Sequence, residues 1–189
     1  MEYLQMSRED FKSHVKTTTV APAPDKVTVG AGIVRNSSNK GPQVLLLKRN
    51  ASEAYYPNVF EMPGGKVDAT DSTIRDALVR EVAEETRLMV VDVKAPLSPI
   101  AYTTEKRDKN ADGVERVVKR HTFQLSYIIS VQGDGSNFRV NKDEHSEGIW
   151  ADRGVLDGIS ITPDMKKLVC QVLEWAKENC KESPREDMK

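Results

Sequence analysis

A glycine turn followed by a strongly acidic helix constrains this chain more than any other stretch. It runs from Pro63 to Leu88 and reads PGGKVDATDSTIRDALVREVAEETRL. Towards its end, Glu81, Glu84 and Glu85 stand at positions i, i+3 and i+4, the spacing that brings side chains together on one face of a helix. The sequence therefore predicts three carboxylates on one small patch.

Carboxylates at this spacing repel one another by a few tenths of a kcal/mol per pair, and only Arg80 lies next to them in the sequence. A hard divalent cation would reverse the sign of the interaction, because Mg²⁺ and Mn²⁺ select carboxylate oxygens as ligands. The backbone at Gly64 and Gly65 carries no side chain and can approach the same point closely. An exposed acidic helix is the alternative, since Glu forms helices well and usually lies in water. The glycines upstream favour the metal site.

This segment resembles the Nudix box, G-x5-E-x7-R-E-U-x-E-E-x-G-U, in which U is a bulky aliphatic residue. The matching positions are Gly65, Arg80, Glu81, Val82, Glu84, Glu85 and Leu88. The flanking strand pattern extends the resemblance to most of residues 27–175. The resemblance implies an α/β fold, the Nudix-type α/β/α sandwich with a mixed β-sheet.

Two positions depart from the family pattern. Fourteen residues (66–79) separate Gly65 from Arg80 where the pattern has thirteen, so the first glutamate slot falls on Ser72. We interpret this as a one-residue loop insertion and expect Asp71 to substitute for the glutamate. The second departure is Arg87 in the glycine slot, where a left-handed helix end costs a residue with a Cβ roughly 1 kcal/mol.

The resemblance implies a divalent-metal-dependent hydrolase of a nucleoside diphosphate linked to another moiety, in which water attacks a phosphorus of the pyrophosphate. The cofactor would be Mg²⁺ or Mn²⁺. Glu81 and Glu85 would hold the metal, Glu84 would be a ligand or a bridge to the attacking water, and the Gly65 carbonyl could complete the coordination shell. Arg80 would orient the glutamates.

Further site residues follow from the same resemblance. Many relatives carry an additional active-site glutamate in the loop before a strand that bears a tryptophan, and Glu144 is our first choice for this general base, with Glu147 second. Lys48 and Arg49 leave a predicted strand where relatives often contact substrate phosphate, although solvated charges at a strand end explain them equally well. Tyr56 could stack on a base.

The substrate is approached by elimination. The ADP-ribose subgroup usually has a proline where Thr104 stands, and the dinucleotide-polyphosphate subgroup prefers a tyrosine where Glu105 and Lys106 stand. The additional motif of coenzyme A hydrolases is absent. A nucleoside triphosphate or a nucleotide-sugar-like substrate remains. The competing interpretation is a catalytically weak or inactive Nudix-fold protein that binds nucleotides or regulates, suggested by Arg87 and the inserted residue.

Length and charge exclude few classes of protein. The 189 residues suit one domain, and a net charge of −1 with a pI of about 6.3 gives no general attraction to nucleic acid or to anionic membranes. The N-terminus has no apolar signal-peptide region, so we expect a cytoplasmic protein. The resemblance implies that its partner is a small-molecule nucleotide. A homodimer is compatible with the sequence.

We divide the chain into an N-terminal arm (residues 1–25), a Nudix domain (26–180) and a polar tail (181–189). In the arm we expect a short helix over residues 7–15 and an extended linker from Thr17. Helices are predicted to begin near Thr73 and at Thr162. The predicted strands are Lys26–Arg35, Gln43–Lys48, Met89–Val93, Pro99–Thr104, His121–Val131 and Gly148–Ala151. The charged residues 105–120 are predicted to form a hairpin loop in solvent.

Overall fold

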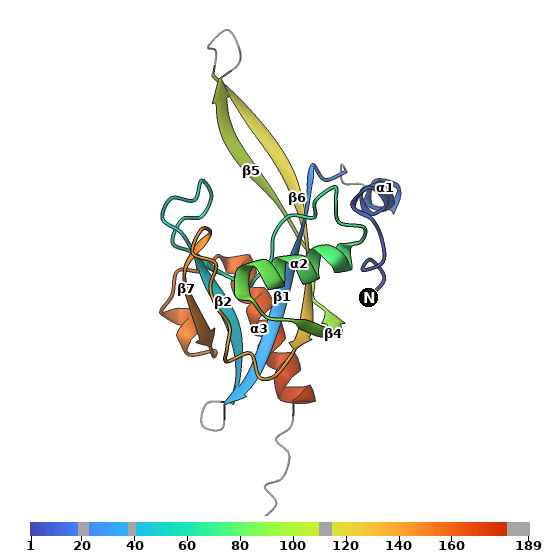
Figure 1. The fold of residues 1–189 in the computed structure, drawn as a ribbon. Helices are drawn as coiled ribbons and strands as arrows, with labels where there is room; N and C mark the ends of the chain where they lie inside the picture. Colours follow the sequence, from blue (N-terminus) through green and yellow to red (C-terminus); the bar gives the residue numbers. More distant parts are fainter. Residues whose placement is uncertain (19–22, 38–40, 110–114, 181–189) are drawn as a thin grey trace, which may run out of the picture.

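A mixed sheet of seven strands forms the centre of the computed structural model, which describes residues 1–18, 23–37, 41–109 and 115–180 (Figure 1). The strands are β1 (Lys26–Ser37), β2 (Gly41–Arg49), β3 (Phe60–Glu61), β4 (Val90–Pro96), β5 (Ile100–Lys109), β6 (Glu115–Val131) and β7 (His145–Ala151). The helices are α1 (Arg8–Thr18), α2 (Ile74–Thr86), α3 (Pro163–Asn179) and the short 3₁₀ helix η1 (Val155–Asp157). All six predicted strands are present, and β3 was not predicted.

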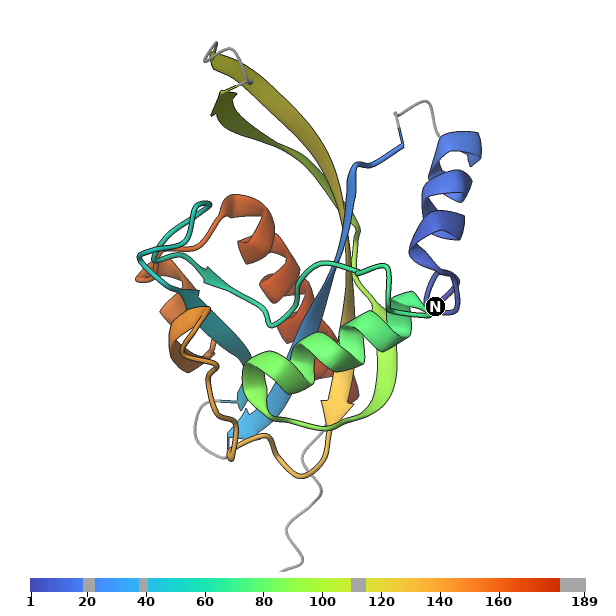
Figure 2. The same ribbon diagram turned by 45° about the horizontal axis from the view of Figure 1, so that its top comes forward.

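The strand order is β3-β2-β1-β6-β4, with β5 also pairing with β6 and β7 with β2. β1 runs parallel to β6 and antiparallel to β2, which makes the sheet mixed. Figures 1 and 2 show α2 and α3 on opposite faces. Because side chains alternate along a strand, β1 and β2 bury one set of residues in a core beneath α2, such as Val29 and Leu47, and β2 buries Val44 and Leu46 beneath α3. The predicted α/β/α sandwich is confirmed.

The charged stretch 105–120 corrects a prediction. We expected a loop, but β5 and β6 stay paired from Ile100↔Gln124 to Lys109↔Glu115, and the ribbon projects beyond the rest of the sheet (Figure 1). A two-stranded ribbon with both faces in water needs no buried side chains, and cross-strand pairs such as Glu105–Lys119, 2.9 Å apart, support it. Residues 110–114 of this predicted hairpin loop lie outside the described residues.

The N-terminal arm packs against the domain. Ser7 caps the start of α1, since its Oγ accepts the Asp10 N–H at 3.1 Å. The helix is longer than predicted and includes Thr17 and Thr18, whose hydroxyls donate to the His14 carbonyl oxygen, so the linker does not begin at Thr17. Figure 2 shows the chain's N-terminus beside the start of α2.

Candidate active site

Local capping fixes both ends of α2, the helix that carries the three glutamates. As predicted, it begins after Thr73, whose hydroxyl accepts the Asp76 N–H while the Asp76 carboxylate accepts the Thr73 N–H, both at 3.1 Å. It ends at Arg87, which is left-handed (φ 60°, ψ 15°) and donates its N–H to the Ala83 carbonyl oxygen at 3.0 Å. The helix therefore keeps a left-handed end without glycine.

The two glycines bring the backbone against this helix. A Cβ on Gly65 would lie 2.6 Å from the Glu81 Oε2, and a Cβ on Gly64 would lie 2.2 Å from the Val29 carbonyl oxygen. The Gly64 N–H, at φ 150°, donates to the Glu85 Oε2 at 2.8 Å. The Gly65 carbonyl oxygen accepts the Val29 N–H at 2.8 Å, which leaves its second lone pair. Only glycine fits at position 64, where a Cβ would meet backbone atoms, whereas a Cβ at position 65 would displace the Glu81 carboxylate.

The three carboxylates differ in burial. Glu81 is 8% exposed and Glu85 is 2% exposed, whereas the Glu84 side chain is 52% exposed. Burial raises the pKa of Glu81, and it raises the pKa of Glu85 well above its ordinary value. The charges of Glu61 and Glu144 raise the pKa of Glu85 further. A cation bound between these carboxylates would therefore reduce the repulsion between their negative charges.

Arg80 connects the three glutamates to the loop of residues 66–73, which lies in the segment that is one residue longer than the family pattern. Its Nε donates to the Asp71 Oδ1 at 2.9 Å and its Nη2 to the Oδ2 at 2.8 Å, while its Nη1 donates to Glu81 at 2.9 Å and to Glu84 at 3.1 Å. The Arg80 guanidinium holds the pKa of Asp71 below its usual range. Asp71 therefore binds Arg80, and the neighbouring Ser72 is exposed.

Sequence reasoning missed Glu61 and His145. His145 is 1% exposed, with its Nε2 3.3 Å from the Glu61 Oε1 and its Nδ1 3.8 Å from the Glu85 Oε1. Arg49 donates from Nη1 to the same Glu61 oxygen at 2.7 Å. The only sequence signal was position: Glu61 precedes the glycines by three residues, and His145 follows Glu144. Their meeting depends on the pairing of β2 with β3 and β7.

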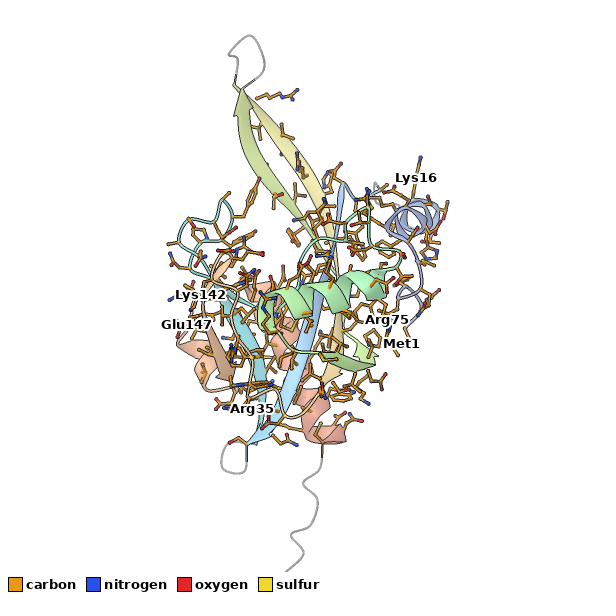
Figure 3. All side chains as sticks on the ribbon, viewed as in Figure 1. Met1, Lys16, Arg35, Arg75, Lys142 and Glu147 are labelled. Atoms are coloured by element: carbon orange, nitrogen blue, oxygen red, sulfur yellow. The ribbon has the colours of Figure 1, made fainter. Side chains whose placement is uncertain are left out.

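The two candidates for the general base occupy different surroundings. Glu144 is near enough to Glu81 and Glu85 for its charge to raise both their pKa values. Glu147 lies at the β7 edge of the molecule (Figure 3) and faces Lys48, with 3.7 Å between the ammonium nitrogen and the Oε2. Of the two, Glu144 is the one beside the carboxylate patch.

Tyr56, the residue predicted to stack on a base, lines a cavity of about 260 Å³. Tyr56, Glu61, Tyr102, Gln124 and Met165 are part of its lining. Lys48 stands close by, with its Nζ 5.6 Å from the centre of the Phe60 ring, another lining residue. The cavity is thus joined through Glu61 to the carboxylate patch.

Arg49 is already occupied by protein groups. Besides Glu61, it donates from Nη2 to Glu53 at 2.7 Å and from Nε to the Tyr55 carbonyl oxygen at 2.9 Å. All three guanidinium nitrogens therefore have partners, and contact with a substrate phosphate would require one of these bonds to exchange.

The donor set fits a hard cation. In the described part of the chain, no three His, Cys, Asp or Glu side chains already stand in the arrangement of a formed metal shell. Arg80 donates hydrogen bonds to Glu81 and Glu84, and the Gly64 N–H donates one to Glu85. The buried carboxylates, all oxygen donors, nevertheless face a backbone notch that a Cβ would fill. This is the chemistry that Mg²⁺ and Mn²⁺ require.

Comparison with known proteins assigns the family. Residues 26–171 match the NUDIX domain family model. The chain belongs to the Nudix family. An 8-oxo-dGTP diphosphatase of Escherichia coli (strain K12) is 37% identical over 60 residues, which are 32% of this chain and 43% of that protein. The match therefore spans less than half of that relative.

Solved Nudix structures share the fold. A MutT NUDIX hydrolase from Burkholderia pseudomallei has a TM-score of 0.55 at 25% identity, over 78% of this chain and 97% of that one. The NUDIX domain of Shewanella oneidensis NrtR, complexed with ADP ribose, has a TM-score of 0.56 at 17% identity, over 93% and 100% of the chains. A C. elegans Ap4A hydrolase has a TM-score of 0.56 at 17% identity, over 81% and 98%. The last two show the fold alone.

The Nudix match begins at residue 26, so α1 and the residues before it lie outside the matched region. Among the helices of the described residues, none combines the length and the apolar character needed to cross a membrane.

Proposed function

We propose that this Nudix protein is a Mg²⁺- or Mn²⁺-dependent pyrophosphohydrolase that cleaves a nucleoside diphosphate linked to another moiety. The observation that carries the proposal is the convergence of the buried Glu81 and Glu85 on the notch at Gly64 and Gly65. Burying two carboxylates beside each other costs free energy unless a positive charge joins them. Of the two, Arg80 reaches only Glu81, and the His145 Nδ1 stands 3.8 Å from Glu85, so a cation in the notch would stabilise the charged form of both carboxylates.

The residue roles follow from burial and position. Glu81 and Glu85 hold the metal from inside, and the exposed Glu84 reaches it or its water from the solvent side. The Gly65 carbonyl keeps one lone pair for the metal. When bound, the cation neutralises phosphate oxygens and lowers the pKa of the attacking water. Glu144, beside this patch, accepts the proton of that water as general base.

The cavity beside Glu61 accommodates the nucleoside. Its walls combine aromatic rings for stacking, from Tyr56 and Tyr102, with the amide of Gln124 for hydrogen bonding. Lys48 has a long ion pair with Glu147, at 3.7 Å, which a phosphate can displace. Arg49 acts indirectly by fixing Glu61. This arrangement supports a nucleoside triphosphate or a nucleotide-sugar-like substrate.

The alternative, a Nudix-fold protein without catalysis, loses its sequence arguments. Arg87 keeps the left-handed helix end, and the inserted residue leaves Asp71 bound to Arg80. A coupled phosphate-release screen over nucleoside triphosphates, nucleotide sugars, ADP-ribose and dinucleotide polyphosphates, with and without Mg²⁺, tests the proposal. Cleavage of the pyrophosphate bond frees no inorganic phosphate by itself, so inorganic pyrophosphatase for the triphosphates, or alkaline phosphatase for the other substrates, converts the products to phosphate. Mg²⁺-dependent release from any of them supports it. Nucleotide binding without release under all conditions would establish the alternative.

A further inference from the structure

The N-terminal arm supplies hydrogen-bond acceptors to the first turn of α2. The first N–H groups of a helix have no acceptor within the helix. Here the Ile74 N–H donates to the Met6 carbonyl oxygen at 2.9 Å, and the Arg75 N–H donates to the Leu4 carbonyl oxygen at 3.0 Å. Thr73 serves the third group, Asp76. The start of the glutamate helix is therefore closed partly by residues outside the region that matches the Nudix family.

Apolar contacts hold the arm in this position. Leu4, Phe11 and Val15 are buried in the same core cluster as Ile74 and Leu78 of α2. The Phe11 ring packs edge-on against Tyr3, at 5.2 Å between centroids, and against Phe123 of β6, at 5.4 Å. The arm therefore packs against both α2 and the sheet.

The arm also contacts the other end of the lengthened loop. This loop, residues 66–73, joins the glycines to α2 and lies within the segment that is one residue longer than the family pattern. The Arg8 Nη1 donates to the Val67 carbonyl oxygen at 3.5 Å, near the loop's start, while Met6 binds Ile74 just after its end. Asp71, which grips Arg80, lies between these two contacts.

We propose that the N-terminal arm is a positioning element of the metal site: by closing both ends of the loop 66–73, it holds Asp71 against Arg80 and so sets the place of Glu81 and Glu84. One chain of hydrogen bonds leads from the arm to the glutamates. It runs from the loop through Asp71 and Arg80 to the carboxylates of Glu81 and Glu84.

The test measures metal affinity in the full chain, because the inference rests on the proposed function but does not need turnover. Mn²⁺ is titrated and the free ion is followed by electron paramagnetic resonance, for the wild type, Phe11→Ala, Arg8→Ala and Lys16→Ala. Lys16 is the matched control, since it lies on α1, is exposed and points away from the domain (Figure 3). We expect Phe11→Ala and Arg8→Ala to weaken Mn²⁺ binding by roughly three- to tenfold, less than the 10–100-fold typical of direct outer-shell partners, and Lys16→Ala to bind like the wild type.

A double-mutant cycle separates positioning from plain stability. If the arm acts through Asp71, then Arg8→Ala has no further effect on Mn²⁺ affinity in an Asp71→Asn background, whereas independent contributions would add. Arg8 is only partly buried, and Arg8→Ala removes no contact of the hydrophobic core. This variant therefore still tests the effect of the arm on Mn²⁺ affinity if Phe11→Ala fails to fold. Unchanged Mn²⁺ affinity in folded Arg8→Ala, or full additivity with Asp71→Asn, overturns the proposal.

The outcomes also distinguish this inference from the proposed activity. A wild type that binds Mn²⁺ but releases no phosphate from any nucleotide overturns the proposed activity. The proposed effect of the arm is then still decided by comparing the Mn²⁺ affinities of the arm variants with that of the wild type. A wild type that binds no Mn²⁺ overturns both.

Discussion

The carboxylate of Asp71 binds the guanidinium of Arg80 through two parallel hydrogen bonds, 2.9 and 2.8 Å long. This bidentate geometry fixes the plane of the guanidinium, which then reaches Glu81 and Glu84 with its remaining nitrogen. The pair joins a loop that is one residue longer than the family pattern to the helix that carries the three glutamates, and it places an acidic side chain next to Ser72 in the first glutamate slot.

Replacing Asp71 tests this pair. Asp71→Asn removes the charge from a side chain that is 6% exposed and leaves Arg80 without its main partner. We expect the free energy of unfolding to fall by about 1–3 kcal/mol, the range for hydrogen bonds to charged groups, and the Mg²⁺ concentration needed for half-maximal activity to rise. Ser72→Ala is the control and should change stability by less than about 0.5 kcal/mol. Urea denaturation gives the comparison, and equal losses in the two variants would refute the assignment.

Glu85→Gln is expected to abolish turnover and to leave the fold intact. The amide keeps the size of the side chain and an oxygen for the Gly64 N–H, but it loses the charge that holds a hard cation. Thermal unfolding with and without Mg²⁺ checks the cause. At a Mg²⁺ concentration of ten times its Kd, binding should stabilise the wild type by about 1.4 kcal/mol, which corresponds to a rise in Tm of roughly 3–5 °C. The Tm of Glu85→Gln should not change. An NaCl control matches the ionic strength, and near wild-type turnover in the variant would mean that Glu85 holds no metal.

The raised pKa of Glu85 predicts how metal-free stability depends on pH. The unfolded carboxyl titrates near 4.5, and the folded one titrates well above that value because it is buried. Between the two pKa values the native state binds more protons than the unfolded state, so the free energy of unfolding falls as pH rises. Urea unfolding in EDTA should therefore show a steeper loss from acid to neutral pH in the wild type than in Glu85→Gln. Parallel curves would show that Glu85 ionises normally in the folded protein.

Arg87→Gly should stabilise the protein by about 0.5–1 kcal/mol. Arg87 is left-handed, and glycine removes the Cβ penalty of that conformation. Glycine also raises the conformational entropy of the unfolded chain, which offsets part of this stabilisation. Ala83→Gly, at an exposed position inside the same helix, is the opposite control and should destabilise by roughly 1 kcal/mol. A lower denaturation midpoint for Arg87→Gly would contradict the left-handed end.

Glu144 and Glu147 are separated by their effects on kcat. We expect Glu144→Gln to lower kcat by about 10²–10⁴-fold, the usual contribution of a general base, with little change in KM. Glu147→Gln only releases Lys48 and should leave kcat near the wild-type value. Steady-state kinetics on the substrate found in the phosphate-release screen give both values. The reverse ranking would move the base to Glu147.

The sequence by itself determined those features that depend on neighbours along the chain. The period of the helix sets Glu81, Glu84 and Glu85 on one face, the Thr73–Asp76 capping box starts that helix, and the glycines mark the place where a backbone approaches it. The family resemblance followed from the same local pattern, and so did the sandwich with its mixed sheet.

Only the tertiary structure decided which distant groups meet. Glu61 and His145 come together because β3 and β7 both pair with β2, and no local pattern encodes that contact. The stretch 105–120 is mostly strand because the backbone of β5 pairs with the backbone of β6. Its charged composition does not indicate this pairing. The arm's carbonyl groups reach α2 through contacts between residues about seventy positions apart in the sequence. Such contacts form only when the folded core repays the entropy of closing the chain between them.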